Sequence, residues 1–130
     1  GDVNALLSEG RGVTMGDGWE TRRRREPGND WIVVQLGTSG FVDEIEIDTA
    51  HFKGNFPDKC SIQAALVEKG FDVNSAENWK ELMPKQSLSA DAIHKFKKEI
   101  ANDFGPVNAI RLNIYPDGGV SRLRIFGKAL

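Results

Sequence analysis

Cysteine and long apolar runs are scarce in this chain of 130 residues, and each shortage excludes a class of protein. The one cysteine, Cys60, cannot form a disulfide within the chain and leaves no Cys/His set for a structural zinc ion. We therefore expect a reducing compartment, the cytosol. No apolar run approaches the roughly 20 residues that span a bilayer, so we expect no membrane partner.

A positive charge excess is also missing. Seventeen Lys and Arg residues stand against 19 Asp and Glu residues, which gives a formal charge of −2. A nucleic-acid-binding domain is normally basic, so we expect no nucleic-acid partner. No Gly-x-Ser-x-Gly motif, phosphate loop or suggestive Cys–His pair is present, and nothing indicates nucleophilic or nucleotide-dependent catalysis. The opening residues, Gly1–Asn4, show no Met and no signal-peptide pattern, and we interpret them as the interior of a longer protein.

What the chain does contain is a series of short apolar segments between glycine-rich turns. In one of them Ile45 and Ile47 fall on the same pleat face, on the side of Phe41 and Asp43, as in a half-buried strand. Another segment, Trp31–Leu36, is almost continuously apolar, which indicates burial on both faces of the sheet. The pattern predicts an all-β sandwich forming a single domain over residues 1–130. The predicted strands are Trp31–Leu36, Val42–Asp48, Cys60–Val67, Ala109–Tyr115 and Val120–Gly127.

Three stretches need separate interpretation. Asn74 or Ser75 is a suitable cap for a short helix within 72–82. Periodicity alone leaves Ala92–Ile100 open between helix and strand. The Pro116–Gly119 turn predicts a hairpin between the last two strands, which by itself explains the glycines.

The densest group of functional side chains is the arginine run Arg22–Arg25. In an extended segment Arg22 and Arg24 point one way and Arg23 and Arg25 the other. Paired guanidinium forks suit bidentate capture of a carboxylate. The alternatives are a solvated charge run or an anchor for neighbouring carboxylates. Those carboxylates are Asp17, Glu20 and Glu26.

Two further groups stand in loops or on a strand face. His51 lies beside Lys53 in a Gly- and Pro-containing loop, where an imidazole can act as general acid or base or can simply pack. The other histidine, His94, has the weaker claim to a catalytic role. Arg111 and Asn113 share a polar strand face that can meet these loops.

Three segments together resemble the allantoicase family: Met15–Arg25, Asp48–Asp58 and Arg111–Arg124. The resemblance runs from about Asn4 to Gly127, and the run Trp-Glu-Thr-Arg-Arg-Arg-Arg is its most specific part. It implies a galactose-binding-like jelly roll, present twice in the family, with this chain similar to the second, C-terminal repeat. It also implies that Ala92–Ile100 is a strand. The implied activity is hydrolysis of allantoate to ureidoglycolate and urea.

The resemblance also implies partners and site residues. The first strand of the repeat and the other repeat are missing, so we expect a companion repeat in a longer chain and a homo-oligomer. A divalent cation held by Asp or Glu is possible, although no ligand spacing requires one and no metal ligands are assigned. The expected catalytic residues are Glu20, His51 and Asp17. The expected substrate-binding residues are Arg22, Arg23, Arg24, Arg25, Lys53, Asn55, Arg111, Tyr115, Asp117 and Arg122.

Two rival functions remain open. A jelly roll is also used as a non-catalytic module for a carbohydrate or a small anion, and fold does not fix function. Its stacking platform here would be Trp19, Phe52, Phe56 and Tyr115, of which at least two are expected in the core or at its rim. The other rival is a structural repeat of a larger enzyme.

Overall fold

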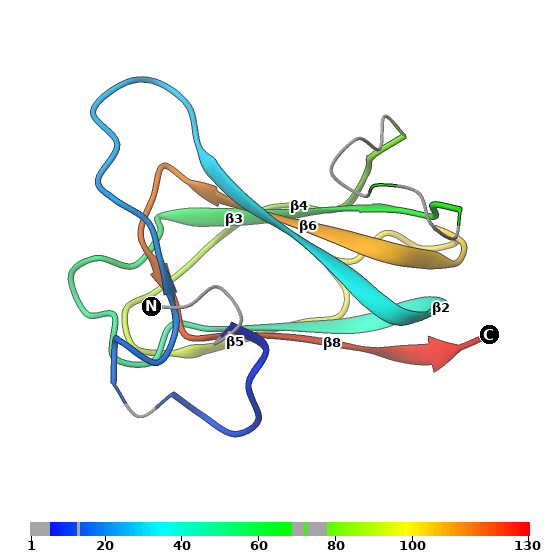
Figure 1. Ribbon diagram of the computed structural model, residues 1–130, viewed down its shortest axis with the longest axis horizontal. Helices are drawn as coiled ribbons and strands as arrows, with labels where there is room; N and C mark the ends of the chain where they lie inside the picture. The colour runs from blue at the N-terminus through cyan, green and yellow to red at the C-terminus, as the bar shows by residue number, and fades with distance from the viewer. Residues whose placement is uncertain (1–5, 13, 69–71, 73–77) are drawn as a thin grey trace.

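The computed structural model describes residues 6–12, 14–68, 72 and 78–130, and within them the chain is built of strands without an α-helix. Two antiparallel layers face each other, as Figure 1 shows, which confirms the predicted all-β sandwich. No helix in the described residues is long and apolar enough to cross a membrane. The strands are β1 (Trp19–Glu20), β2 (Asp30–Asp48), β3 (Lys59–Ala65), β4 (Lys80–Ser87), β5 (Ile93–Phe96), β6 (Val107–Tyr115), β7 (Gly119–Val120) and β8 (Arg122–Ala129).

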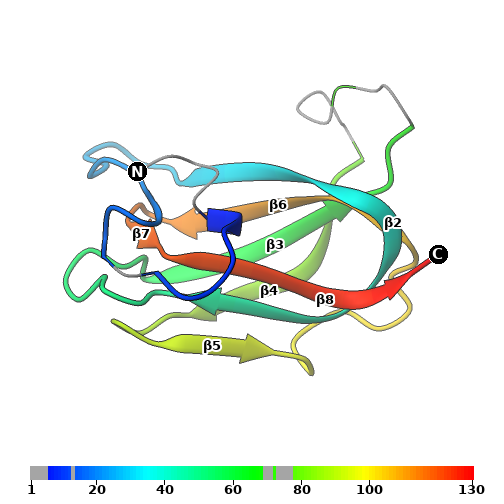
Figure 2. The same ribbon diagram turned by 60° about the horizontal axis from the view of Figure 1, so that its bottom comes forward.

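The long strand β2 belongs to both layers. Its first part, Asp30–Gln35, pairs with β6, so that the upper layer in Figure 1 has the order β4-β3-β6-β2. Its last part, Gly40–Asp48, pairs with β8, and Ile45–Asp48 also pairs with β5 to complete the lower layer. The two-stranded ribbon of β1 and β7 lies at one end of the sandwich, at the left in Figure 2.

The core lies between the two layers and follows the period of two expected of half-buried strands. Ile45 and Ile47 of β2 are completely buried, and so are Ile110, Leu112 and Ile114 of β6. The predicted phase is therefore confirmed for Ile110–Ile114 of β6 and for Ile45 and Ile47 of β2. The opposite side of β6 carries polar side chains, so one layer presents a polar outer face.

The alternation predicted for the start of Val42–Asp48 is wrong because of a β-bulge. Val42 pairs with Gly127 and Glu44 pairs with Phe126, which leaves Asp43 as an extra residue in β2. The bulge reverses the alternation, so Val42 packs against the core. Phe41, expected on the side of Ile45, is 44% exposed.

Two further expectations about strands are wrong. The segment Trp31–Leu36 is not buried on both faces, because Trp31 lies on the outer face of the upper layer with 54% of its surface exposed. The Pro116–Gly119 turn does not form a hairpin: β6 pairs with β2 and β3, whereas β8 pairs with β2. The turn instead carries the chain from one layer to the other.

The two ambiguous stretches resolve differently. The strand that the family resemblance implies within Ala92–Ile100 is present as β5, and it ends at Phe96. The short helix expected within 72–82 falls largely outside the described residues. That helix was expected to run through Trp79, which is not helical, and β4 begins at the next residue, Lys80.

Candidate active site

Segments far apart in the sequence meet at the end of the sandwich where β1 and β7 pair. The backbone N–H of Thr21 donates to the carbonyl of Gly118 at 2.9 Å, and Thr21 Oγ1 accepts from the N–H of Gly118 at 3.1 Å. The N–H of Gly119 donates to the carbonyl of Asn55 at 2.8 Å. The segments around residues 20, 55 and 118 are therefore in direct contact, at the left in Figure 1.

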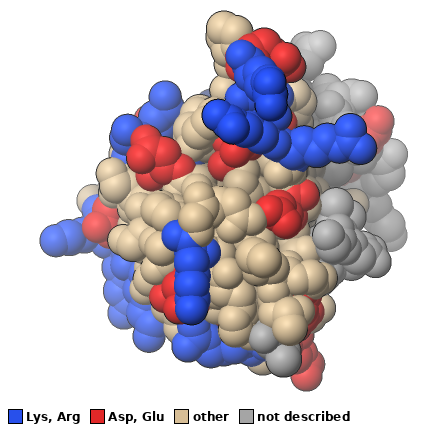
Figure 3. Space-filling model, turned by 90° about the vertical axis from the view of Figure 1, so that its left-hand side faces the viewer, with Lys and Arg blue, Asp and Glu red and all other residues tan. Residues whose placement is uncertain are grey.

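One carboxylate is oriented by this contact. The side-chain amide of Asn55 donates to Glu20 Oε2 across 35 positions of sequence. Glu20 closes β1 and is exposed at this end of the molecule. Figure 3 shows this end, where acidic and basic side chains are interspersed over an otherwise neutral surface.

The four arginines of the run differ in their surroundings. The N–H of Arg24 donates to Asp117 Oδ2 at 2.6 Å, and its guanidinium lies 3.0 Å from Asp30 Oδ1. Its side chain is only 25% exposed. Arg22, Arg23 and Arg25 are exposed. Arg24 thus anchors the segment, while its neighbours present their guanidinium groups to solvent.

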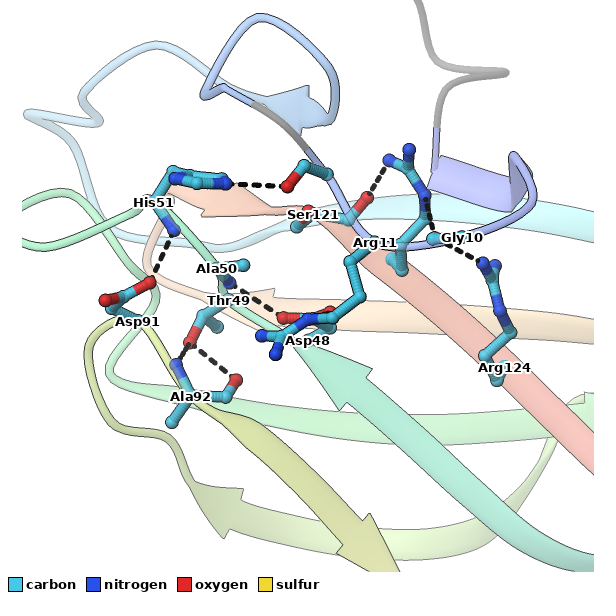
Figure 4. Close-up of polar contacts among 12 residues, drawn as sticks. Gly10, Arg11, Asp48, Thr49, Ala50, His51, Asp91, Ala92, Ser121 and Arg124 are labelled. Carbon is cyan, nitrogen blue, oxygen red and sulfur yellow. Dashed lines mark hydrogen bonds and ion pairs between the residues drawn. The ribbon is translucent and has the colours of Figure 1, made fainter.

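His51 is held in an unusual backbone conformation by the loop around it. Its φ is 72°, and its N–H donates to Asp91 Oδ1 at 2.8 Å. Ala50 N–H donates to Asp48 Oδ1 at 2.8 Å one residue earlier, and Figure 4 shows these contacts together. His51 Nε2 lies 2.6 Å from the carbonyl of Gly12. Because a carbonyl only accepts, Nε2 carries a proton, and the lone pair of a neutral ring is on Nδ1.

The carboxyl of Asp91 is affected by the same loop. The hydrogen bond from the His51 backbone is the main reason that the pKa of Asp91 lies below its ordinary value of 3.8. The charges of Lys53, His51 and Arg11 act in the same direction, against a desolvation effect. Asp91 therefore stays ionised under His51, and Lys53, expected to bind substrate, is exposed nearby.

Arg122 fastens the early segment of the chain to β8. The residue is 3% exposed, and its Nη1 donates to the carbonyls of Asp17 at 2.5 Å and Ser121 at 2.7 Å. Its Nη2 pairs with Asp17 Oδ2 at 3.0 Å, and its Nε donates to the carbonyl of Gly10 at 3.1 Å. Arg124 Nη2 donates to the same Gly10 carbonyl at 2.9 Å. These contacts hold residues 8–12 and 14–17, called here the N-terminal strap, against the sandwich.

The two remaining expected residues lie elsewhere, on the outer face of the upper layer. Arg111 Cζ stands 4.5 Å from the centre of the Trp31 ring. Tyr115 Oη lies 2.9 Å from Ser61 Oγ, and Lys85 Nζ stands 4.3 Å from the centre of the tyrosine ring. The structure therefore divides the expected site residues between the loop end, the strap and this outer face.

A comparison of the whole chain with protein families decides its relationship. Residues 1–130 match the family described as "Allantoicase repeat". The chain belongs to the allantoicase family. It is 54% identical over 131 residues to a probable allantoicase of Pseudomonas savastanoi pv. phaseolicola, with 98% of this chain and 39% of that protein covered. The chain thus spans well under half the length of this relative.

Solved structures support the same family and show that its fold also occurs in other proteins. The crystal structure of an allantoicase from Saccharomyces cerevisiae matches with a TM-score of 0.84 and 39% identity, covering 98% of this chain and 37% of that one. An F5/8 type C domain from Bacteroides fragilis matches with a TM-score of 0.66 at 14% identity, covering 98% of this chain and 82% of that one. The second match concerns the fold alone, and it confirms the galactose-binding-like jelly roll.

The aromatic platform of the rival binding function is largely internal in this allantoicase repeat. Phe52 is completely buried and Trp19 is 6% exposed, while Phe56 packs against the core. The expectation that at least two of these rings belong to the core or its rim is confirmed. Tyr115 is half-buried beneath Lys85.

Some contacts of the site were not expected from the sequence. Asp91 and Asp30 hold His51 and Arg24, but neither lies in a functional motif, and only the folded chain brings them there. His94, in contrast, is satisfied on both ring nitrogens: Nδ1 is 2.9 Å from the Ile47 carbonyl and Nε2 accepts from the Ser89 N–H at 2.8 Å. His94 therefore has a hydrogen-bonded packing role, which was the alternative to a catalytic role for this histidine.

Acidic and imidazole groups do not gather into a metal centre in the part of the chain that the structure describes, where no set of three or more His, Cys, Asp or Glu residues is placed to hold an ion. A cavity of about 650 Å³ is lined by Gln35–Ser39, Leu66–Glu68 and Asn108, none of which is an expected site residue. The candidate site residues instead form an open surface.

Proposed function

We propose that this chain is part of an enzyme that hydrolyses allantoate to ureidoglycolate and urea. Family membership supplies the reaction, and the observation that carries the proposal is the contact between the family's motif segments at one end of the sandwich. Motif residues separated by up to 97 positions hydrogen-bond there, as a composite site requires.

The substrate explains the excess of arginine at this end. Allantoate has one carboxylate and two ureido arms on a single carbon, and a guanidinium fork binds a carboxylate through two hydrogen bonds. The guanidinium of Arg24 is paired with Asp30 and Glu26, so we assign carboxylate binding to its exposed neighbours and to Arg111. The exposed neighbours are Arg22, Arg23 and Arg25.

The ureido arms carry N–H donors that need acceptors. We assign this role to Glu20 and Asn55, with Asp117 acting through Arg24 and Tyr115 and Lys53 at the rim. The carboxylate of Asp17 is paired with Arg122, and we assign both residues to positioning the N-terminal strap in place of direct catalysis or binding.

The reaction needs one proton delivered and one removed. The leaving ureido nitrogen gains a proton as its C–N bond breaks, which releases urea, and water adds to the same carbon and loses a proton. We assign this transfer to Glu20 or to Nδ1 of His51, since Nε2 of His51 already donates to Gly12. General acid–base help of this kind is worth roughly 10²–10⁴-fold in rate.

Three wider properties belong to the same proposal. Coverage of 39% of the relative's length leaves room for a companion repeat, and we propose that the whole protein contains one and forms a homo-oligomer. We propose a cytosolic location because the only thiol, Cys60, is unpaired and buried. A divalent cation has no assigned ligands and no step is given to it.

Urea release from allantoate tests the proposal. The wild-type chain and the variants Glu20→Ala and His51→Ala are compared with Glu68→Ala, an exposed carboxylate beyond the end of β3. We expect at least a hundredfold loss of turnover in one of the first two variants and none in the control. Normal turnover in both Glu20→Ala and His51→Ala would reject the assigned roles, and failure of the protein with its companion repeat to release urea would reject the activity.

A further inference from the structure

The outer face of the upper layer is not an ordinary solvated sheet surface. Cross-strand pairing aligns Asn113 of β6 with Trp31 of β2 and with Ser61 of β3. Asn113 and Ser61 are each only 5% exposed although they point away from the core. An outward polar side chain that is nine-tenths buried has lost its water and needs fixed partners.

Hydrogen bonds fix the orientation of two amides on this face. Asn113 Nδ2 donates to Ser61 Oγ at 3.3 Å and to Gln63 Oε1 at 3.2 Å, which uses both of its protons. The Asn113 carbonyl oxygen therefore remains an acceptor, and the Gln63 NH₂ group remains a donor. A ureido group needs this pair of functions, because it presents N–H donors beside a carbonyl acceptor.

A cation adjoins the amide pair. Arg111 is paired across the strands with Gln63, which places their Cβ atoms about 5 Å apart. Its guanidinium lies over the exposed Trp31 ring at 4.5 Å, and this stacking holds the fork in one plane. Within the described residues Arg111 Nε is buried without a hydrogen-bond acceptor. A buried donor without an acceptor is unfavourable, so the chain itself does not fully satisfy this guanidinium.

We infer that the face formed by Trp31, Gln63, Arg111 and Asn113 is the recognition surface for a ureido carboxylate. Arg111 on its Trp31 base binds the carboxylate, and the amides of Gln63 and Asn113 bind one ureido arm. The inference rests on the proposed function for the identity of the substrate, and it adds groups on the sheet that bind the carboxylate and one ureido arm to those assigned at the loop end. Arg111 and Gln63 are paired on neighbouring strands, so the guanidinium and the amides are about one strand spacing apart. This spacing suits a ligand that carries a carboxylate and a ureido arm on one carbon.

Binding of hydantoate, which has one carboxylate and one ureido arm, tests the surface without any turnover. In ¹H–¹⁵N NMR titrations we expect the indole N–H of Trp31 and the side-chain amide of Gln63 to shift with hydantoate. N-acetylglycine, which lacks the terminal NH₂, is expected to bind at least tenfold more weakly. The variants Arg111→Lys and Gln63→Leu are each expected to lose at least tenfold in hydantoate affinity. Gln35→Leu, on the same face toward the other end of β2, is the matched control and should bind normally.

The outcomes separate this inference from the proposed activity. Equal affinity for hydantoate and N-acetylglycine, or chemical-shift changes confined to the loop end, would overturn the inference that this face binds a ureido carboxylate. Undiminished allantoate turnover in Arg111→Lys and Gln63→Leu would also overturn it while leaving the activity in place. Hydantoate binding on this face in a protein that never releases urea would support the surface and reject the activity. The indole signal of buried Trp19 reports whether each variant is folded.

Discussion

The backbone N–H of Arg24 donates to Oδ2 of Asp117 at 2.6 Å across 93 positions of sequence. The acceptor is a carboxylate in a turn between the two layers, and the donor is the third residue of the arginine run. Its guanidinium is held separately by Asp30. One acidic side chain therefore fixes the course of a segment whose other arginines are exposed.

Removing that carboxylate is expected to loosen the arginine run. Asp117→Ala should lower the free energy of unfolding by about 1.5–3 kcal/mol, the usual worth of a hydrogen bond to a charged group. Urea denaturation measures the change. Asp58→Ala is the control, because its carboxylate is 74% exposed and pairs with neighbouring Lys59, so a loss below about 0.5 kcal/mol is expected. Equal losses in the two variants would contradict the anchoring role of Asp117.

Gly119 is expected to tolerate no side chain. A Cβ at this position would overlap the buried ring of Phe52, whereas a Cβ at Gly54 would meet nothing within 4 Å. Gly119→Ala should therefore cost about 1–3 kcal/mol through overpacking, and Gly54→Ala should leave stability nearly unchanged. Thermal unfolding followed by circular dichroism compares them. An unchanged midpoint for Gly119→Ala would show that Phe52 can move aside.

Arg122 is expected to be the main fastening of the N-terminal strap. Arg122→Met keeps the apolar stem but removes the ion pair with Asp17 and the hydrogen bonds to the carbonyls of Gly10 and Ser121, so stability should fall by about 1–3 kcal/mol. The strap should also become sensitive to limited proteolysis between residues 8 and 17. Lys128→Met removes an exposed cation from the same strand and serves as control. Cleavage at equal rates in both variants would assign the fastening to other contacts.

The contact between Asp91 and His51 is expected to weaken in acid. The folded pKa of Asp91 lies below 3.8, so the contact stabilises the loop at pH values above 3.8 and is lost as the pH falls through the lowered value. The amide proton of His51, followed by NMR, should titrate with a midpoint below 3.8. Asp91→Asn should abolish that titration. A midpoint at or above the ordinary value would show that the hydrogen bond does not form in solution.

Cys60 is expected to be unreactive in the folded protein. Burial raises the pKa of its thiol from 9.0 to about 12, so only roughly one molecule in ten thousand carries a thiolate at pH 8. A disulfide reagent should label the native chain very slowly and the urea-unfolded chain at once. Rapid labelling without denaturant would mean that β3 opens locally.

Much of the sandwich was predictable because its strands follow a simple period. Ile110, Leu112 and Ile114 alternate without interruption, and the structure buries all of them. The prediction was wrong where an extra residue changed the phase, as at Asp43, since a bulge leaves no mark in the hydrophobic pattern. It was also wrong about the hairpin, because a turn motif does not say whether the next strand pairs with the previous one or crosses to the other layer.

The candidate site was predictable in part. The resemblance to allantoicases selected segments that do meet, such as those of Thr21 and Gly118. Which arginines are engaged was not visible, because Arg24 differs from Arg23 only through the distant carboxylates that reach it. The outer-face partners Ser61 and Gln63 carry no motif, and only strand register brings them to Asn113.

The fastening of the N-terminal strap has a consequence for synthesis on the ribosome. Asp17, Trp19 and Arg24 find their partners about a hundred positions later, in Arg122, Val120 and Asp117. These residues cannot dock until nearly all of the domain has been translated, because their partners are synthesised about a hundred residues later. This end of the molecule therefore forms last, and a chain truncated before Asp117 lacks the carboxylate that holds the backbone of the arginine run.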